Sequence, residues 1–247
     1  MSETRRLVLI HGFTERPSMW NALIEGMSDE SLTVTSPSIP GHGSHPEIPD
    51  SRTAQAYCEA ILRQLPDDGL PLIVVGHSMG GYLASGLVTM IPHRIQALGL
   101  FHSKAAADDE VKKDDRRRAI AAAAQNRELY LATMLRNTLA ECNVDRLRDE
   151  LNAMIENAKQ DISMACIEAS HQVMIERADN IAFLQQASFA VHYFLGREDK
   201  SIPLDVVQQE VGRLPRASVQ LLENIGHMGQ IENPVESRNW LIRLCSN

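Results

Sequence analysis

The stretch VVGHSMGGYL, residues 74–83, places glycines on both sides of a serine directly after an apolar run. Glycine weakens strands and helices alike, so its presence on both sides of Ser78 needs a physical reason. A very tight strand-to-helix turn is such a reason, because a Cβ at Gly76 or Gly80 would collide there with neighbouring backbone. The turn strains the serine backbone and raises its hydroxyl above the sheet, so the pattern predicts a nucleophile.

Short apolar, β-branched runs recur along the chain and indicate the fold. They lack strict polar alternation, as do strands that are buried on both faces of a parallel sheet. They are LVLI (7–10), LTVTS (32–36), LIVVG (72–76), IQALGLF (95–101), FAVHYFL (189–195) and SVQLL (218–222). Helix-compatible segments lie between or after them, at about 17–27, 53–65, 79–91, 203–213 and 230–245. Alternating strands and helices predict a doubly wound α/β sheet with its ligand site at the carboxyl ends of the strands.

Residues 104–182 interrupt this alternation. They contain no strand-like run and are rich in good helix formers, with apolar residues at three- and four-residue spacing over 119–141 and 144–160. We expect about four helices here, inserted after the fourth strand as a lid on a core made of residues 1–103 and 183–247. Extra scaffolding is the alternative. The basic run 116–118 is surrounded by acidic residues and predicts a solvated, mixed-charge helix face, with an anion site as the alternative.

A serine nucleophile requires a base, and the base requires an orienting acid, each in a loop just past a later strand. Asp199 follows FAVHYFL by four residues, and His227 follows SVQLL by a few residues. We therefore predict that Ser78, Asp199 and His227 are the catalytic residues.

Other acids and histidines compete for these roles. Glu198 neighbours Asp199, but adjacent side chains on an extended segment point opposite ways. Asp205 lies inside an expected helix, where a first-turn charge favours the helix dipole. His192 falls within a strand run and His171 within an expected lid helix, so we interpret both as structural.

The developing oxyanion of an acyl transfer needs hydrogen-bond donors. The backbone N–H of Met79, directly after the nucleophile, is one candidate, helped by the helix N-terminus. The loop after the first strand supplies the other, because Gly12 permits a sharp turn that aims the N–H of Phe13 at the site. His11 is interpreted as bonding loop backbone, and the Phe13 side chain as lining the substrate cavity.

These motifs resemble those of the α/β-hydrolase superfamily, in particular its lidded esterase, thioesterase and enol-lactonase branch. The matching segments, in family order and spacing, are HGF (11–13), PGHG (40–43), GHSMGG (76–81), GREDKSIP (196–203) and IGHMGQIENP (225–234). The resemblance implies a Ser-Asp-His order along the chain, an acyl-enzyme intermediate, and no metal or organic cofactor. The first apolar run stands at the family's usual third strand, so we expect the first hairpin to be absent and the sheet to be mainly parallel with about six strands.

The substrate pocket is expected to include Phe13, His77, Met134 and Met228, since flexible thioethers suit an adaptable apolar pocket. This favours a small to medium, apolar or aromatic carboxylic ester, thioester or lactone. Plain core packing is the interpretation of most methionines in the expected lid helices. His42 and His45 are interpreted as stabilising the loop 40–51, because the histidines and acids there lack the convergent spacing of metal ligands.

Two other function classes remain open on the same motifs. One is a carbon–carbon bond hydrolase or a lyase of the menaquinone-pathway type. For the lyase, Arg127 and Arg136 are the candidates to hold carboxylates, although the sequence does not distinguish them from surface charges. The other is a small-molecule receptor that no longer turns substrate over. A panel of esters against β-diketones separates the first from ester hydrolysis, and serine labelling without turnover identifies the second.

Composition limits the partners. The net charge of −8 argues against a nucleic-acid role, and no apolar run approaches the roughly 18 residues of a membrane span. The four cysteines form no CxxC pair and no signal peptide is evident, which indicates reduced thiols in a cytoplasmic protein. The expected partner is a small-molecule acyl substrate, and the oligomeric state stays open between a monomer and a homodimer.

Overall fold

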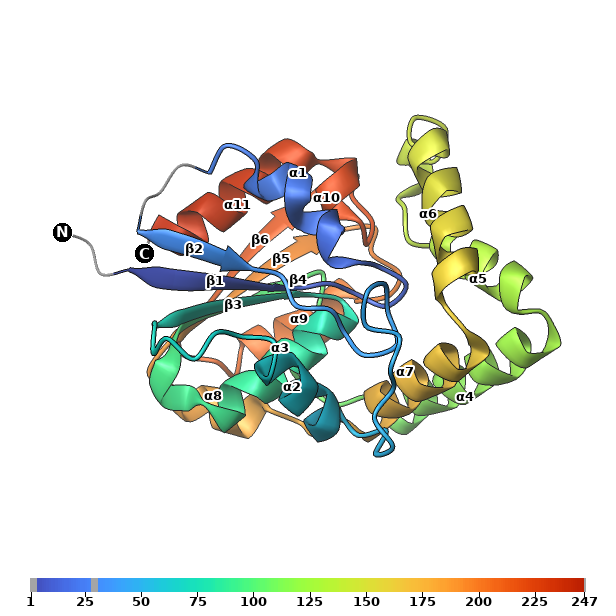
Figure 1. Ribbon diagram of the computed structural model, residues 1–247. Helices are drawn as coiled ribbons and strands as arrows, with labels where there is room; N and C mark the ends of the chain where they lie inside the picture. Colours follow the sequence, from blue (N-terminus) through green and yellow to red (C-terminus); the bar gives the residue numbers. More distant parts are fainter. Residues whose placement is uncertain (1–3, 28–30, 247) are drawn as a thin grey trace.

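The computed structural model describes residues 4–27 and 31–246 and places six strands of that part of the chain in one parallel sheet (Figure 1). The strands are β1 (Arg5–Ile10), β2 (Leu32–Thr35), β3 (Leu72–His77), β4 (Ile95–Phe101), β5 (Ala190–Gly196) and β6 (Ala217–Leu222). Their order is β2-β1-β3-β4-β5-β6, and every neighbouring pair is parallel. The predicted doubly wound sheet of about six parallel strands is confirmed.

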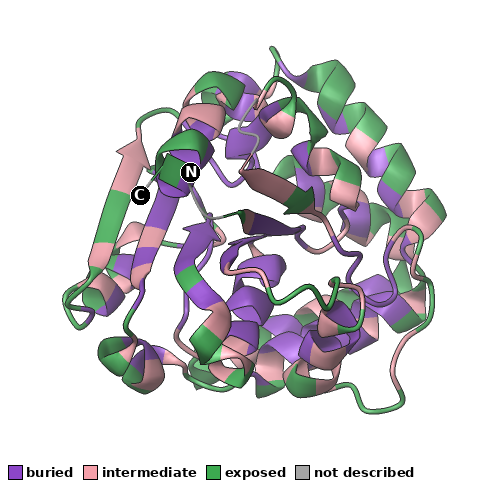
Figure 2. Cartoon of the chain, turned by 60° about the vertical axis from the view of Figure 1, so that its left-hand side comes forward, coloured by how far each residue is buried: buried purple, intermediate pink, exposed green. Residues whose placement is uncertain are grey.

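The inner strands are apolar throughout because both of their faces are covered. In β1, Val8 and Ile10 belong to one buried cluster, whereas Leu7 and Leu9 belong to another on the opposite face. The edge strands β2 and β6 instead contain exposed residues, as Figure 2 shows for the rim of the sheet. The absence of polar alternation in the inner strands thus has a direct cause in this two-sided burial.

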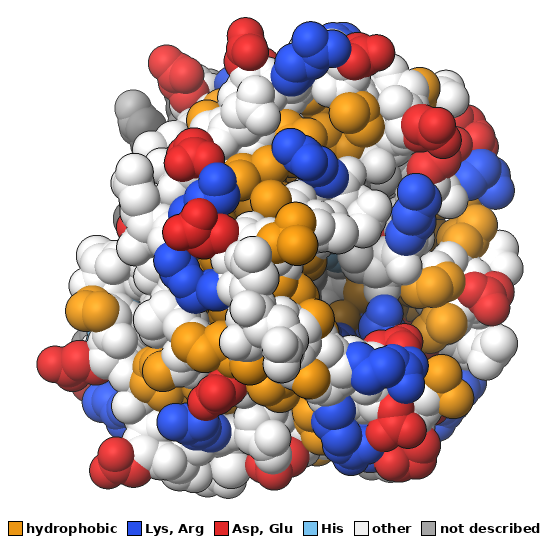
Figure 3. All heavy atoms as spheres, turned by 90° about the vertical axis from the view of Figure 1, so that its right-hand side faces the viewer, with side chains coloured by type: hydrophobic (Ala, Val, Ile, Leu, Met, Phe, Trp, Pro, Cys, Tyr) orange, Lys and Arg blue, Asp and Glu red, His pale blue; other side chains and the backbone are white. Residues whose placement is uncertain are grey.

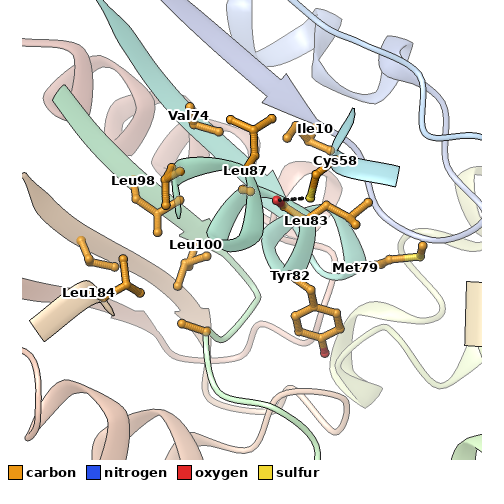
Figure 4. Packing of buried hydrophobic residues seen from close by; sticks show 14 of the residues in the cluster. Ile10, Cys58, Val74, Met79, Tyr82, Leu83, Leu87, Leu98, Leu100 and Leu184 are labelled. Atoms are coloured by element: carbon orange, nitrogen blue, oxygen red, sulfur yellow. Dashed lines mark hydrogen bonds between the residues drawn. The ribbon is translucent and has the colours of Figure 1, made fainter. Parts of the chain in front are cut away.

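Helices of the core pack on both faces of the sheet (Figure 1). One face is covered by α2 (Ala54–Leu62), α3 (Met79–Met90), α8 (Ile181–Gln186) and α9 (Leu204–Val211). The other face is covered by α1 (Asn21–Ile24) and α11 (Pro234–Ser246). Figure 4 shows how Leu83 and Leu87 of α3 pack among Val74 of β3 and Leu98 of β4. The α3 helix is therefore held firmly against the middle of the sheet.

Two helical segments differ in detail from the sequence prediction. The segment predicted as one helix over 17–27 is a 3-10 turn (Pro17–Trp20) followed by the short α1. The segment predicted over 230–245 is divided into α10 (Gly229–Glu232) and α11. Pro234 explains the second division, because it has no N–H and restricts the residue before it to extended backbone.

Between β4 and β5 the chain forms the helices α4 (Glu110–Gln125), α5 (Arg127–Arg136), α6 (Arg148–Asp161) and α7 (Met164–Glu176), before α8 returns it to the sheet. We call residues 104–182 the helical insertion. The side chains of Asp109, Asn126 and Ser163 cap α4, α5 and α7 by accepting backbone N–H groups. The strand arrows in Figure 1 point toward these helices, so the insertion stands beyond the carboxyl ends of the strands.

The helical insertion has an apolar cluster of its own, which includes Leu131, Leu135, Leu151 and Ile155. Met228, from the loop after β6, joins this cluster and ties the insertion to the core. None of the helices in the described part of the chain is long and apolar enough to cross a membrane.

Candidate active site

Ser78 sits at a strained turn between β3 and α3. Its backbone angles are φ 51° and ψ −119°, a conformation that side-chain-bearing residues rarely adopt. A Cβ on Gly76 would lie 2.2 Å from the carbonyl oxygen of Gly80, and one on Gly80 would lie 2.2 Å from that of His11. Both contacts are with backbone that cannot move cheaply, so the turn requires glycine on both sides of the serine.

Ser78, His227 and Asp199 form a hydrogen-bonded chain across three loops. The Ser78 hydroxyl lies 2.8 Å from His227 Nε2, and His227 Nδ1 lies 2.7 Å from Asp199 Oδ2. The other carboxylate oxygen, Oδ1, accepts the backbone N–H groups of Ser201 and Ile202 at 2.8 and 2.9 Å. Burial alone would raise the pKa of Asp199, but His227 and a second histidine outweigh burial and hold that pKa below its usual range.

The second histidine is His102, at the end of β4, which we did not predict. Its Nδ1 lies 3.3 Å from the same Oδ2 atom of Asp199, and its Nε2 is buried without a hydrogen-bond partner among the described residues. Burial lowers the pKa of His102 to about 4, so the ring is neutral at pH 7 and donates from Nδ1. No sequence signal marks this residue, because it stands directly after a strand whose loop the motifs do not cover.

The nitrogen and oxygen atoms of His102, Asp199 and His227 lie within 4.8 Å of one another, close enough to resemble a metal site. A metal ligand must present a deprotonated nitrogen. Here both ring nitrogens nearest to Asp199 face the same carboxylate oxygen as hydrogen-bond donors. This arrangement suits orientation of a carboxylate and a base better than metal coordination.

The loop after β1 lies directly beside Ser78. A Cβ on Gly12 would lie 2.7 Å from Glu15 Oε2, 2.9 Å from His77 Nδ1 and 3.3 Å from the Ser78 Cβ, so glycine allows the loop to approach these buried groups this closely. None of the described residues accepts a hydrogen bond from the backbone N–H of Phe13 or of Met79. The backbone amides of Phe13 and Met79, which were predicted as oxyanion donors, thus both have an N–H group without an acceptor among the described residues.

Glu15 and His77 form a buried ion pair beneath this loop. His77 Nδ1 donates to Glu15 Oε2 at 2.7 Å, and His77 Nε2 donates to the backbone carbonyl of His227 at 2.9 Å. Glu15 also accepts the Gly12 backbone N–H at 2.6 Å and the Gln230 amide at 2.9 Å. Burial alone would lower the pKa of His77, but the Glu15 carboxylate outweighs burial and raises it. The His77 ring, facing two acceptors, is therefore an imidazolium that joins the first loop to the His227 loop.

A cavity of about 140 Å³ opens above Ser78 and His227. This is the volume scale that accommodates a benzene-sized group. The four expected pocket residues, Phe13, His77, Met134 and Met228, all lie on its wall. The wall also includes residues that sequence analysis missed, namely Glu15, Tyr82, Lys112, Arg116 and Tyr130.

Arg116 corrects one sequence prediction. We expected the whole run 116–118 to be solvated, and Arg117 and Arg118 are indeed exposed, but Arg116 is only 9 % exposed and lines the cavity. Arg116 and the buried Ala123 are seven residues apart on α4, so they lie on one face of that helix. Helical spacing could have placed Arg116 on the buried face, whereas the local charge pattern concealed it.

The competing residues have other partners. Glu198 accepts the backbone N–H of Ile225, and Asp205 lies in the first turn of α9. His192 bonds the Ser218 hydroxyl at the edge of the sheet. His171 reaches the cavity wall, where its Nε2 lies 2.7 Å from the Tyr130 hydroxyl.

The buried histidines in the loops after β1 and β2 form hydrogen bonds with backbone groups. His11 Nε2 accepts the N–H of Ile39, and His42 Nδ1 faces the carbonyl of Pro40. Burial lowers the pKa of His11 to about 4 and that of His42 to about 3, so both rings are neutral at pH 7. The His11–Ile39 hydrogen bond holds the loop after β2 against the loop after β1, and the His42 contact stabilises the second of these loops internally.

Comparison with known proteins assigns this geometry to a family. The family model described as "Alpha/beta hydrolase family" matches residues 7–237. A pimeloyl-[acyl-carrier protein] methyl ester esterase from Aromatoleum aromaticum is 27% identical over 240 residues, which cover 92% of this chain and 93% of that protein. Among solved structures, an esterase from Thermogutta terrifontis superposes with a TM-score of 0.85 at 23% identity, over 99% of this chain and 92% of that one. An enol-lactonase from Burkholderia xenovorans gives a TM-score of 0.85 at 16% identity, over 100% of this chain and 93% of that one.

Proposed function

Because the chain belongs to the alpha/beta hydrolase family, we propose that it is a serine hydrolase that cleaves carboxylic esters, or the related thioesters or lactones, through an acyl-enzyme intermediate. The observation that carries the proposal is the chain of hydrogen bonds from Ser78 to His227 to Asp199 at a strained turn facing a cavity. Similarity to an esterase over nearly the whole chain supports ester hydrolysis as the reaction class.

Each group in this chain has a definite task. His227 Nε2 takes the proton of the Ser78 hydroxyl as the oxygen attacks the ester carbonyl, and then gives this proton to the leaving alcohol. Asp199 fixes the tautomer in which Nδ1 carries a proton and stabilises the imidazolium that forms. Water, with His227 again as base, then hydrolyses the acyl-enzyme and regenerates Ser78.

The tetrahedral intermediate places a negative charge on the former carbonyl oxygen. The backbone N–H groups of Phe13 and Met79 are the donors proposed for it, and the N-terminus of α3 adds favourable dipole potential. The Glu15–His77 ion pair supports this arrangement by holding the Gly12 amide and the His227 backbone in register.

The wall nearest the chemistry suits a small to medium acyl group with apolar or aromatic character. Phe13, Met134, Leu135 and Met174 supply apolar surface, and Met228 closes the wall from the side of the core. These flexible thioethers and rings allow the cavity to adapt to related acyl groups. We propose such esters as the substrate class.

The lyase alternative depended on Arg127 and Arg136. Arg127 donates to the backbone carbonyls of Lys159 and Ile162, and Arg136 is exposed. Neither lines the cavity that contains Ser78. The receptor alternative is compatible with the same contacts between Ser78, His227 and Asp199, so the turnover of esters separates it from ester hydrolysis.

The direct test is Ser78→Ala, measured by hydrolysis of p-nitrophenyl acetate and of a panel of methyl esters. We expect turnover to fall by about 10⁴- to 10⁶-fold, as removal of a serine nucleophile does elsewhere. The circular dichroism spectrum and unfolding curve should stay close to those of the wild type, since alanine fills the same place at the turn.

Ser85→Ala is the matched control, because it makes the same chemical change seven residues further along α3. Ser85 is buried and bonds the Tyr82 carbonyl, away from the cavity. We expect it to retain activity. Hydrolysis that persists in Ser78→Ala at wild-type rates would show that another group is the nucleophile.

A further inference from the structure

One carboxylate in the helical insertion faces three cations. Asp108 is 4 % exposed, and its oxygens lie 2.8 Å from Arg177 and 3.5 Å from Lys104, with Arg116 in a direct ion pair. Burial alone would raise the pKa of Asp108, but the two arginines outweigh burial and hold that pKa below its usual range. The cluster thus carries an excess of positive charge, and Arg116 brings part of that excess to the cavity wall.

Lys112 adds a second cation to the same wall. It lies one helical turn before Arg116 on α4, so both side chains project from one side of that helix. Lys112 is half-buried, and its ammonium makes no ion pair with a described residue. Its neighbour Lys113 instead pairs with Glu110 at 2.8 Å.

Further polar groups surround this end of the cavity. Tyr82 leaves the packing side of α3 with its hydroxyl pointing away from the other labelled side chains (Figure 4), and the Arg177 guanidinium lies 3.8 Å from its ring centroid. His171 Nδ1 is buried with no hydrogen-bond partner among the described residues. The space-filling view of the face that carries the insertion has a hollow with a histidine in its depth and Lys and Arg side chains on its rim (Figure 3).

The carboxylates near these cations are already engaged. Glu15 is paired with His77, and Glu210 accepts the backbone N–H groups of Ala105 and Ala106. Asp109 and Asp115 border a separate surface hollow that Lys112 also touches. No acid other than Glu15 lines the cavity among the described residues, and Glu15 is paired with His77, so no carboxylate of this wall neutralises Lys112.

We propose that this end of the cavity binds a carboxylate that belongs to the substrate, so that the preferred substrates are esters bearing a free carboxylate in the same molecule. Lys112 and Arg116 hold the carboxylate, while Ser78 acts on the ester carbonyl at the other end of the cavity. This inference rests on the proposed ester hydrolysis and narrows its substrate class. A charge-assisted contact in a part-buried site is worth far more there than on an open surface.

The test compares kcat/KM for monomethyl and dimethyl esters of succinate, glutarate and adipate. Each pair differs only in the terminal carboxylate. The wild-type enzyme should prefer the monomethyl ester of at least one chain length. In Lys112→Met, kcat/KM for that monomethyl ester should fall roughly tenfold or more relative to kcat/KM for the matching dimethyl ester, the scale of a hydrogen bond to a charged group, so the preference for the monomethyl ester is lost.

Two further variants make the comparison specific. Lys113→Met removes a lysine from the adjacent position of α4, outside the cavity wall, and should change kcat/KM for neither the monomethyl nor the dimethyl ester. Lys112→Arg keeps the charge and should preserve most of the preference for the monomethyl ester.

The acetyl ester of 4-hydroxybutyrate, which has its carboxylate in the alcohol part, shows on which side of the scissile bond the carboxylate lies.

A binding measurement separates this inference from the proposed reaction. Calorimetric titration of Ser78→Ala with monomethyl adipate, with and without Lys112→Met, reports the carboxylate site in the absence of turnover. Equal kcat/KM for monomethyl and dimethyl esters in the wild type and in Lys112→Met overturns the inference and leaves ester hydrolysis standing. Lysine-dependent binding of the monoester without hydrolysis of any ester would instead retain the carboxylate site and overturn the proposed function.

Discussion

The backbone at Ser78 depends on three close approaches, each of which only glycine permits. Gly76 and Gly80 let α3 start directly above β3, and Gly12 brings the first loop to the serine side chain. The strain at Ser78 is held in place because the helix that follows is buried against the sheet along most of its length. Residues that carry no functional group thus set the position of the Ser78 hydroxyl.

Gly80→Ala tests this directly. The added Cβ would lie 2.2 Å from the carbonyl oxygen of His11 and 2.4 Å from that of Ile10. Since backbone must move to accommodate it, we expect the free energy of unfolding to fall by about 3 kcal/mol or more, and activity to fall with it. Urea denaturation measures the stability.

Gly86→Ala is the control on the same helix. Its Cβ would meet only the Cys58 sulfur, at 3.2 Å, and alanine is the better helix former. We expect a change of less than about 1 kcal/mol in either direction. Equal effects of the two substitutions would mean that β1 does not approach α3 as closely as described.

At the scale of single residues, the sequence allowed the candidate catalytic residues to be predicted where they directly follow the end of a strand. Ser78, Asp199 and His227 each stand in a loop just past an apolar run, and the order of these runs is readable without a structure. His102 and Arg116 were not predictable in this way. The first depends on which strands are neighbours in the sheet, and the second on which side of α4 is buried.

At the scale of elements, the loops after β1, β3 and β6 act as one unit. His77 at the end of β3 bonds Glu15 of the first loop and the backbone of His227 in the last loop. The motifs of the sequence predict that each of these loops lies at the site, but they do not indicate that a buried ion pair joins them. Neither Glu15 nor His77 carries a local pattern that distinguishes an ion pair from two separate polar residues.

His77→Gln is expected to destabilise the enzyme in a pH-dependent way. The pKa of His77 is raised in the folded state above its unfolded value of about 6.5. The stability it contributes is therefore fully present below about pH 6.5 and lost as the pH rises through the folded pKa. Glu15, whose pKa is lowered because His77 outweighs burial, stays ionised over this range.

Urea denaturation of wild type and His77→Gln from pH 6 to pH 9 measures this contribution. The difference in free energy of unfolding should be largest at pH 6 and shrink toward pH 9. His93→Gln, at an exposed position, should show no such trend. A constant difference across the range would mean that His77 is neutral and that the contact with Glu15 is an ordinary hydrogen bond.

At the scale of the whole molecule, the sheet and the helical insertion contribute different things to the cavity. The sheet, with helices on both faces, holds the loops that carry Ser78, Asp199 and His227. The insertion has its own apolar cluster and supplies the wall with Met134, Arg116 and other side chains. The core was predictable because two-sided burial leaves a clear pattern of apolar runs. The insertion was predictable only as helices, since their packing decides which side chains reach the cavity.

Buried neutral histidines should make the whole fold sensitive to acid. Burial lowers the pKa to about 4 for His11 and His102 and to about 3 for His42 and His171. Between about pH 6.5 and these values the unfolded chain binds protons that the folded chain does not, so stability falls as the pH falls. Glu210, whose pKa is raised, acts in the opposite direction over part of this range, whereas the contribution of His77 is already fully present below about pH 6.5.

His42→Gln isolates one of these contributions. Between pH 7 and pH 5 the free energy of unfolding should fall in both proteins, but by about 2 kcal/mol less in the variant than in the wild type. The reason is that the pKa of His42 is about 6.5 in the unfolded chain and about 3 in the folded one, so the folded ring stays unprotonated throughout this range. Urea denaturation at pH 7, 6 and 5 measures the slope, with the exposed His93→Gln as the control that should keep the wild-type slope. Identical slopes in His42→Gln and wild type would show that His42 accepts its proton in the folded state as readily as in the unfolded one, and that burial beneath the loop after β1 does not exclude the charge.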